Sequence, residues 1–258
     1  MRTRIFFFSG TGNSLYIAKE LRERIKNTTL FNIKDCRDEA IVIEKERVGI
    51  VFPVYACGMP HIVERFVARL KPNENSYIFA ISTSASGYGT VLQQVNTELT
   101  QKHHPLDAAF NIFMPSNYLP FGGAESRKKQ QKKFTAAREA LDMIAPLIVE
   151  LTQTPIPRQW FLPHWFCQLS HRIFMNRLER EVEKFHVDAK RCNGCQLCLK
   201  VCPVNNITLI ENRPDWGKKC EQCFACLQFC PSQAILRGRI SPKRKHYHHP
   251  KIKPQELF

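Results

Sequence analysis

The sequence predicts an α/β domain with a five-stranded parallel sheet and helices on both of its faces, followed by a small cysteine-rich α+β domain. Short apolar runs alternate with helix-like segments over residues 1–151, and strands that are connected through helices form parallel sheets. Eight of the eleven cysteines then fall within residues 192–230. We therefore divide the rest of the chain into a linker and connecting helix over 152–186, a cysteine-rich domain over 187–238 and a basic tail over 239–258.

The expected strands are short runs rich in β-branched and aromatic residues, each followed by a turn or a helix-like segment. They cover residues 4–9, 28–33, 48–53, 77–83 and 108–115. The last helix of this domain is the clearest, because its apolar residues recur every three or four positions. They are Phe134, Ala137, Leu141, Ile144, Ile148 and Leu151. The following segment TQTPIPR contains two prolines and is expected to be a linker.

The connecting segment begins with a cluster of aromatic residues, and a helix-like pattern follows. Its aromatic residues are Trp160, Phe161, Trp165 and Phe166, and its later apolar stripe contains Met175, Leu178, Val182 and Phe185. A helix lying on a membrane surface has a similar pattern. Acidic residues are interspersed with basic ones along this helix, so we expect the aromatic residues to dock one domain on the other. His164 and His171 have no partner at metal-ligand spacing, so we expect neither of them to bind a metal.

Each of two cysteine motifs reads C-x-x-C-x-x-C-x-x-x-C-P. Three thiolates at this spacing can hold three corners of a cuboidal iron–sulfur cluster, while the fourth cysteine ligates the cluster of the other motif. We assign one [4Fe-4S] cluster to Cys192, Cys195, Cys198 and Cys230, and the other to Cys220, Cys223, Cys226 and Cys202. Zinc is disfavoured because its sites use two well-separated C-x-x-C pairs, which leaves the third cysteine of each motif without a role.

The paired motifs resemble the two-cluster bacterial ferredoxin domain over about residues 187–238. The other cysteines, Cys36, Cys57 and Cys167, are expected to pack as small apolar residues. No apolar run is long enough for a signal sequence or a membrane span, so we expect a cytoplasmic protein whose cysteines stay reduced.

The first expected strand leads into the loop SGTGNS at residues 9–14. Its backbone N–H groups around Gly12, the hydroxyls of Ser9, Thr11 and Ser14, and the amide of Asn13 can surround a phosphate at a helix N-terminus. The loop lacks the lysine of a Walker motif. A dinucleotide-binding pattern would need a third glycine where Leu15 stands, and hydroxyls suit a terminal phosphate better than a pyrophosphate.

These features resemble the flavodoxin family over about residues 3–151, whose first loop holds the phosphate of FMN. The resemblance implies flavin contacts in the loops after the third, fourth and fifth strands, at the edge of the sheet where open α/β sheets bind ligands. The candidate residues are Val54, Tyr55, Ala56 and Gly58, then Thr83, Ser84, Gly87 and Tyr88, then Asn117 and Tyr118. Tyr55 and Tyr88 offer faces for stacking on the flavin ring. A flavodoxin-like domain that binds no flavin remains the alternative.

Both halves together resemble fused flavodoxin–ferredoxins, the bacterial EFR family of flavodoxin-like ferredoxins. The resemblance implies an iron–sulfur flavoprotein with two [4Fe-4S] clusters and FMN. A cluster carries one electron and FMN takes one or two, so we expect electron transfer between clusters and FMN that couples one-electron carriers to a two-electron acceptor. The alternative is a flavin-dependent reductase of a small oxidant, such as a quinone or nitro compound, fed by the clusters.

The formal net charge is +15, with basic runs in residues 126–133 and in the tail. Such charge attracts acidic partners, and we expect an acidic redox protein as electron donor or acceptor. Peripheral contact with an anionic membrane stays open. Nucleic acid is disfavoured because the basic segments lack the interleaved aromatics of a base-stacking surface. We expect the tail, rich in charge and proline, to be disordered.

Overall fold

The computed structural model describes residues 1–36, 39–158, 163–239 and 243–258 of the chain. Trp160 and Phe161, which we expected to dock the domains, lie outside these residues. A search of the described helices for one that is long and apolar enough to cross a bilayer finds none.

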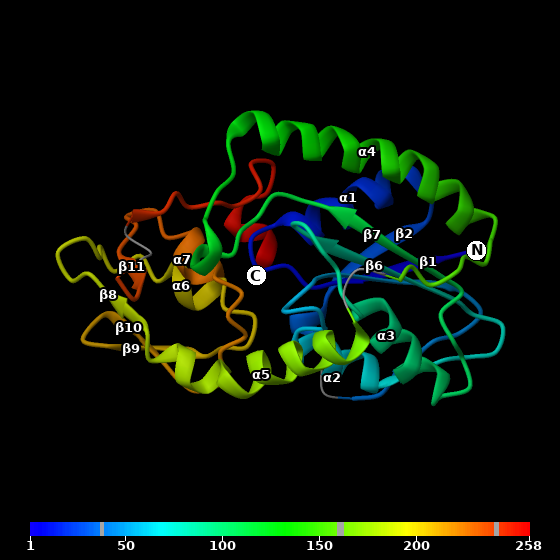
Figure 1. Cartoon of the computed structure of the whole chain (residues 1–258), viewed down its shortest axis with the longest axis horizontal. Helices are drawn as coiled ribbons and strands as arrows, with labels where there is room; N and C mark the ends of the chain where they lie inside the picture. Colours follow the sequence, from blue (N-terminus) through cyan, green and yellow to red (C-terminus); the bar gives the residue numbers. More distant parts are fainter. Residues whose placement is uncertain (37–38, 159–162, 240–242) are drawn as a thin grey trace.

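The N-terminal half is built on a parallel sheet with the strand order β2-β1-β4-β6-β7. Its strands are β1 (Thr3–Phe7), β2 (Thr28–Asn32), β4 (Arg47–Pro53), β6 (Tyr77–Ser84) and β7 (Ala108–Phe113). Helices α1 (Asn13–Arg24) and α4 (Arg127–Val149) cover one face, and α2 (His61–Ala68) and α3 (Val91–Thr100) cover the other (Figure 1). The predicted five-stranded sheet with helices on both faces is confirmed.

Two hydrophobic cores follow from the alternation of side chains along each strand. Ile5 and Phe7 of β1 pack under α1 and α4, whereas Phe6 and Phe8 pack under α2 and α3. The predicted stripe of α4 is buried except for Leu151, which is 43% exposed. The helix ends at Val149, so Leu151 leaves the helical stripe. One short parallel pair, β3 (Ile41–Val42) with β5 (Leu70–Lys71), was not predicted because two residues show no periodicity.

The cysteine-rich half follows the connecting helix α5 (His164–Val182) and combines short strands with two single-turn helices. Strands β9 (Ile207–Ile210) and β10 (Arg213–Trp216) pair antiparallel, as do β8 (Phe185–Val187) and β11 (Ile235–Arg237). Each cysteine motif contains one of the two helices, α6 (Leu197–Lys200) or α7 (Ala225–Gln228). This small α+β unit agrees with the sequence prediction.

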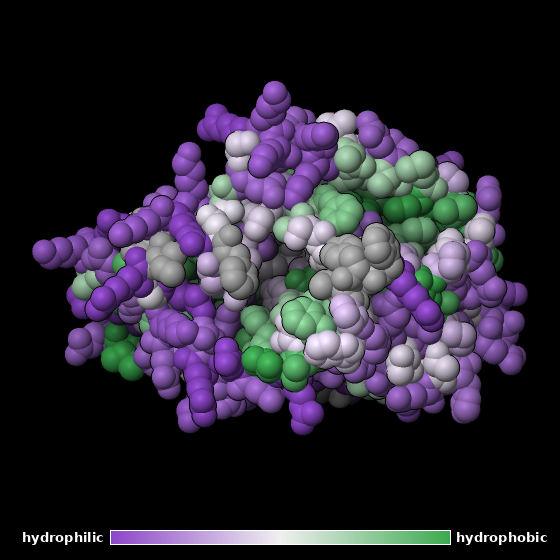
Figure 2. Space-filling model, viewed as in Figure 1, coloured by the Kyte–Doolittle hydropathy of each residue, from purple (hydrophilic) through white to green (hydrophobic). Residues whose placement is uncertain are grey.

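The docking of the two halves differs from our expectation. Trp165 and Phe166 are 66% and 46% exposed, so the prediction that they join the domains is wrong. Figure 2 shows hydrophobic residues at the surface over α5. The halves instead meet through α6 and α7, where Val201, Ala225 and Phe229 complete the core under α1 and α4. Apolar area buried there holds the two halves together.

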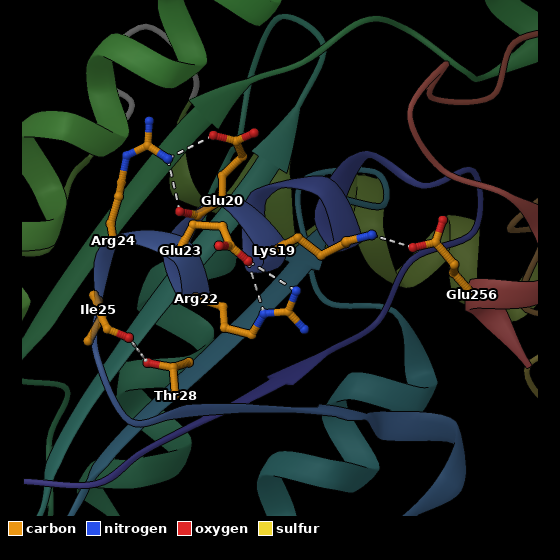
Figure 3. Close-up of polar contacts among 8 residues, drawn as sticks. All are labelled: Lys19, Glu20, Arg22, Glu23, Arg24, Ile25, Thr28 and Glu256. Atoms are coloured by element: carbon orange, nitrogen blue, oxygen red, sulfur yellow. Dashed lines mark hydrogen bonds and ion pairs between the residues drawn. The ribbon is translucent and has the colours of Figure 1, made fainter.

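Residues 243–258 of the C-terminal tail are ordered, contrary to our expectation. Tyr247, Ile252 and Leu257 are each 3% exposed and join the core under α1 and α4. The tail lies beside α1 in Figure 1, and Figure 3 shows the ion pair of Glu256 with Lys19 of α1. Three apolar residues spaced five apart among charges give no periodic signal, but each fills a pocket of the folded protein.

Candidate functional site

A cavity of about 340 Å³ lies at the carboxyl end of the parallel sheet. Its walls come from the loops after β1, β4, β6 and β7, from α5, and from the second cysteine motif. Open α/β sheets bind ligands at this edge, where the strand order reverses between β1 and β4. The cavity therefore gathers residues from both halves of the chain.

Most of the residues that we predicted to contact FMN line this cavity. They are Ser9, Thr11, Asn13, Ser14, Val54, Tyr55, Ala56, Thr83, Ser84, Gly87, Asn117 and Tyr118. Three predicted residues lie outside its wall. Gly12 caps α1, Gly58 exchanges two backbone hydrogen bonds of 2.9 Å with Tyr55, and Tyr88 packs against the core under α2 and α3.

The loop after β1 is held in shape by its own side chains. Ser9 Oγ accepts from the backbone N–H of Gly12 at 3.0 Å. Ser14 Oγ lies 2.8 Å from Thr83 Oγ1, which ties the loop to β6. The loop opens directly into the twelve residues of α1, whose first N–H groups have no partner within the helix. A helix N-terminus of this kind favours an anion such as a phosphate.

The amide of Asn13 has two hydrogen-bond partners within the protein. Its Nδ2 donates to the carbonyl oxygen of Pro115 at 3.0 Å, and its Oδ1 accepts from the Tyr247 hydroxyl at 2.6 Å. The backbone N–H of His249 also donates to the carbonyl of Thr11 at 2.8 Å. Asn13 therefore braces the loop against the segment after β7 and against the tail, which leaves one N–H of its amide for a phosphate.

The loop after β4 is supported by α5. Tyr55 borders the cavity, and its ring meets those of Phe8 and Phe174 edge-on at centroid distances of 6.3 Å. Nδ1 of His171 donates to the carbonyl oxygen of Tyr55 at 3.0 Å. Burial lowers the pKa of His171, which keeps the ring neutral. His171 therefore positions the loop, a role for which the sequence carries no signal.

Cys57 also lines the cavity and lies next to Cys167 of α5. Burial, and after it the neighbouring Cys167 thiol, raise the pKa of Cys57 to about 12. A thiol with so high a pKa stays protonated and unreactive at neutral pH. The two cysteines thus pack as the sequence suggested.

The eight motif cysteines gather in two sets, each around a small cavity. Cys192, Cys195, Cys198 and Cys230 line one, and Cys220, Cys223, Cys226 and Cys202 line the other. The backbone N–H groups of Asn206 and Ala234 donate to the sulfurs of Cys202 and Cys230, each at 3.3 Å. Hydrogen bonds of this kind to the sulfurs help to set the reduction potential of an iron–sulfur cluster. Among the described residues, no three metal-binding side chains converge on one point as a single ion requires.

Burial makes four of these eight thiols poor acids. The pKa values of Cys198 and Cys220 are each raised to about 11, mainly by desolvation, and those of Cys223 and Cys226 are also raised. Buried thiols of this kind become thiolates only when a cation compensates their charge. Iron supplies that charge, so both the placement and the chemistry of the cysteines fit iron–sulfur clusters.

Comparison with known proteins agrees with this division. A flavodoxin domain model matches residues 4–120, and a 4Fe-4S dicluster domain model matches residues 184–231. The chain joins a flavodoxin domain to a 4Fe-4S dicluster domain. A search of curated proteins found no match. The two domains support an iron–sulfur flavoprotein, with FMN and iron–sulfur clusters, that transfers electrons.

Several solved structures resemble the flavodoxin domain. An azoreductase from Bacillus anthracis str. Sterne is 11% identical with a TM-score of 0.39, over 56% of this chain and 99% of that one. Megasphaera elsdenii flavodoxin in its two-electron reduced form is 16% identical with a TM-score of 0.36, over 53% and 98% of the two chains. The rubredoxin oxygen:oxidoreductase of Desulfovibrio gigas is 17% identical with a TM-score of 0.34, over 55% and 36%.

The flavodoxin and dicluster domains touch at the loop after β1, residues 9–14. Cys223 borders both the large cavity and the cavity of its own cysteine set. A Cβ placed on Gly10 would lie 2.5 Å from the carbonyl oxygen of Cys223, so only glycine allows this approach. Arg65 adds an ion pair of 3.4 Å to Glu221, whose side chain is 4% exposed.

Proposed function

We propose that this iron–sulfur flavoprotein transfers electrons between two [4Fe-4S] clusters and FMN, and so couples one-electron carriers to a two-electron acceptor. FMN can exchange one or two electrons, whereas each cluster exchanges one. One observation carries the proposal. Cys223, a candidate ligand of the second cluster, also forms part of the wall of the cavity predicted for FMN.

The placement of the two cysteine sets supports an order for the relay. Cys195 of the first set is exposed, whereas the second set lies against the flavodoxin domain. An external carrier would therefore exchange electrons with the first cluster, and the second cluster would connect it to the flavin. Lys190 and Arg191 are exposed beside Cys192, which favours an acidic redox protein as the carrier.

The size of the cavity fits one bound cofactor. Ligand cavities hold single drug-sized molecules at roughly 300–1,000 Å³, and this one measures about 340 Å³.

Cofactor content is the first test. Protein purified without oxygen should hold about eight iron and eight sulfide ions and one FMN per chain. Zinc in place of iron and sulfide would contradict the proposal.

Transfer within one chain is the second test. After rapid anaerobic mixing with a one-electron donor, FMN should be reduced through the clusters at a rate that does not depend on protein concentration, because the two domains are held together in one chain. A rate that rises with protein concentration would show transfer between chains instead. A variant with Cys198→Ser should slow this reduction while FMN remains bound.

A further inference from the structure

Gln222 is a buried residue in the wall of the large cavity whose amide has no partner. It lies between the candidate ligands Cys220 and Cys223 and is 3% exposed. Neither Nε2 nor Oε1 of its side chain has a hydrogen-bond partner among the described residues. Buried amides are nearly always paired, so an unpaired one indicates a missing partner.

The other buried polar side chains of the cavity wall already have partners. Ser14 pairs with Thr83, and Thr11 Oγ1 accepts from Asn117 Nδ2 at 2.7 Å. Asn13 uses both ends of its amide. Within the described part of the cavity wall, Gln222 alone combines a buried side chain with unpaired polar atoms.

The first cysteine motif provides an internal comparison. Gly194 occupies the position of Gln222, and both residues have a left-handed backbone, with φ of +69° and +49°. Glycine adopts this conformation freely, whereas a residue with a side chain is strained in it. The first motif, which lies away from the large cavity, has a glycine at this position. The second motif, which borders the cavity, has a glutamine whose backbone is strained. Strain at such a position often marks a functional side chain.

We propose that the side chain of Gln222 hydrogen-bonds FMN, so that the dicluster domain completes the flavin site. A carboxamide offers two N–H donors and one carbonyl acceptor, and FMN presents imide, carbonyl, hydroxyl and phosphate groups that can pair with them. The backbone N–H of Gln222 also donates to Cys220 Sγ at 3.3 Å. One residue thus contacts a cluster ligand and the flavin. The inference rests on the proposed function, because it requires FMN in this cavity.

Two variants of the full-length protein with intact clusters separate hydrogen bonding from packing. Gln222→Met keeps the length of the side chain but removes its hydrogen-bonding groups. Gln222→Gly introduces the residue of the first motif and relieves the backbone strain. Gln233→Gly is the matched control, because Gln233 has a φ of +50°, is exposed, and belongs to the same domain.

FMN is titrated into flavin-stripped protein, and binding is followed by the loss of flavin fluorescence. Both Gln222 variants should bind FMN roughly tenfold more weakly, because one hydrogen bond is lost. The control should bind like the parent protein. Cluster absorption should stay unchanged in all three. Riboflavin serves as a second ligand: an equal loss for both places the contact on the ring or ribityl chain, and a loss for FMN alone places it on the phosphate.

An affinity of Gln222→Met equal to that of the parent would overturn the inference, whatever Gln222→Gly does. Equal losses in Gln222→Gly and Gln233→Gly would also overturn it, because they would indicate a backbone effect common to both positions. A parent protein that binds no FMN would instead overturn the proposed function, and this inference with it.

Discussion

The two cysteine motifs have the same spacing but lie in different surroundings. In the first, Cys195 is exposed, and so are Asn193 and Gln196 on either side of it. In the second, the matching residues Glu221 and Phe224 are 4% and 3% exposed. Glu221 pairs with Arg65, and Phe224 meets Tyr118 edge-on at a centroid distance of 5.6 Å. The residues between the cysteines thus show which motif faces the flavodoxin domain.

The tail adds to this difference, because it joins α7 of the second motif to the loop after β1. The backbone N–H of Tyr247 donates to Gln228 Oε1 at 2.7 Å, and its hydroxyl reaches Asn13. The His248 ring stacks on Phe229 at 4.8 Å. Equal spacing therefore allows both motifs to hold a cluster, while the surroundings place only the second motif against the large cavity. In the proposed relay this difference assigns the second cluster to the flavin and the first to a partner.

The largest expected effect tests whether the two motifs exchange their fourth ligands. Cys202→Ala should damage the cluster of Cys220, Cys223 and Cys226, although Cys202 follows the first motif in sequence. Iron should fall from about eight to about four per chain, and the EPR signal of the other cluster should remain. Cys230→Ala is the control and should remove the first cluster. Loss of the first cluster in the Cys202 variant would refute the exchange.

A second change acts on the contact that only the second motif makes. Gly10→Val should push Cys223 away from the loop, since even a Cβ would lie 2.5 Å from its carbonyl oxygen. Overpacking of about 1–3 kcal/mol would lower the ratio of docked to undocked domains roughly fivefold to 150-fold. Stopped-flow reduction of FMN should slow accordingly, with the iron content unchanged. An unchanged rate would show that this contact lies off the electron path.

A third change tests whether the tail supports the flavin loop. Tyr247→Phe removes the hydroxyl that donates to Asn13 and should lower the free energy of unfolding by about 1–2 kcal/mol. FMN affinity should fall a few-fold, because the loop loses a brace. Tyr77→Phe is the matched control: its hydroxyl donates to the Thr152 carbonyl at 2.6 Å, outside the cavity wall. It should destabilise the protein similarly in urea denaturation while FMN affinity stays the same.

The smallest effect concerns the pH dependence of tail docking. Burial lowers the pKa of His249 to about 3, below its usual value of about 6.5. Between these values the unfolded chain binds a proton that the folded chain does not, so stability falls as the pH drops below 6.5. Between pH 7 and pH 5.5 the parent should lose about 1 kcal/mol more stability than His249→Phe. His186→Phe, at an exposed site, should behave like the parent.

Local patterns explain what could be predicted. The strands follow from short continuous apolar runs, because a strand covered by helices on both faces of the sheet buries nearly all its side chains. Helix α4 follows from periodicity, because its apolar residues lie on one face. The cysteine spacing indicates cluster ligation for a similar reason, since three ligands lie within one short loop. The loop SGTGNS was located from its hydroxyls and glycines, but the partners of Asn13 were not, because Tyr247 lies 234 residues away in sequence.

The two domains, the parallel sheet and the eight cysteines that can hold clusters are all predictable from the amino-acid sequence. Folding alone shows which motif faces the large cavity, that Gln222 borders it, that His171 supports Tyr55, and that residues 243–258 are ordered. Each of these depends on surfaces from distant segments fitting together. Burial and hydrogen bonding between such segments leave no periodic trace in either one.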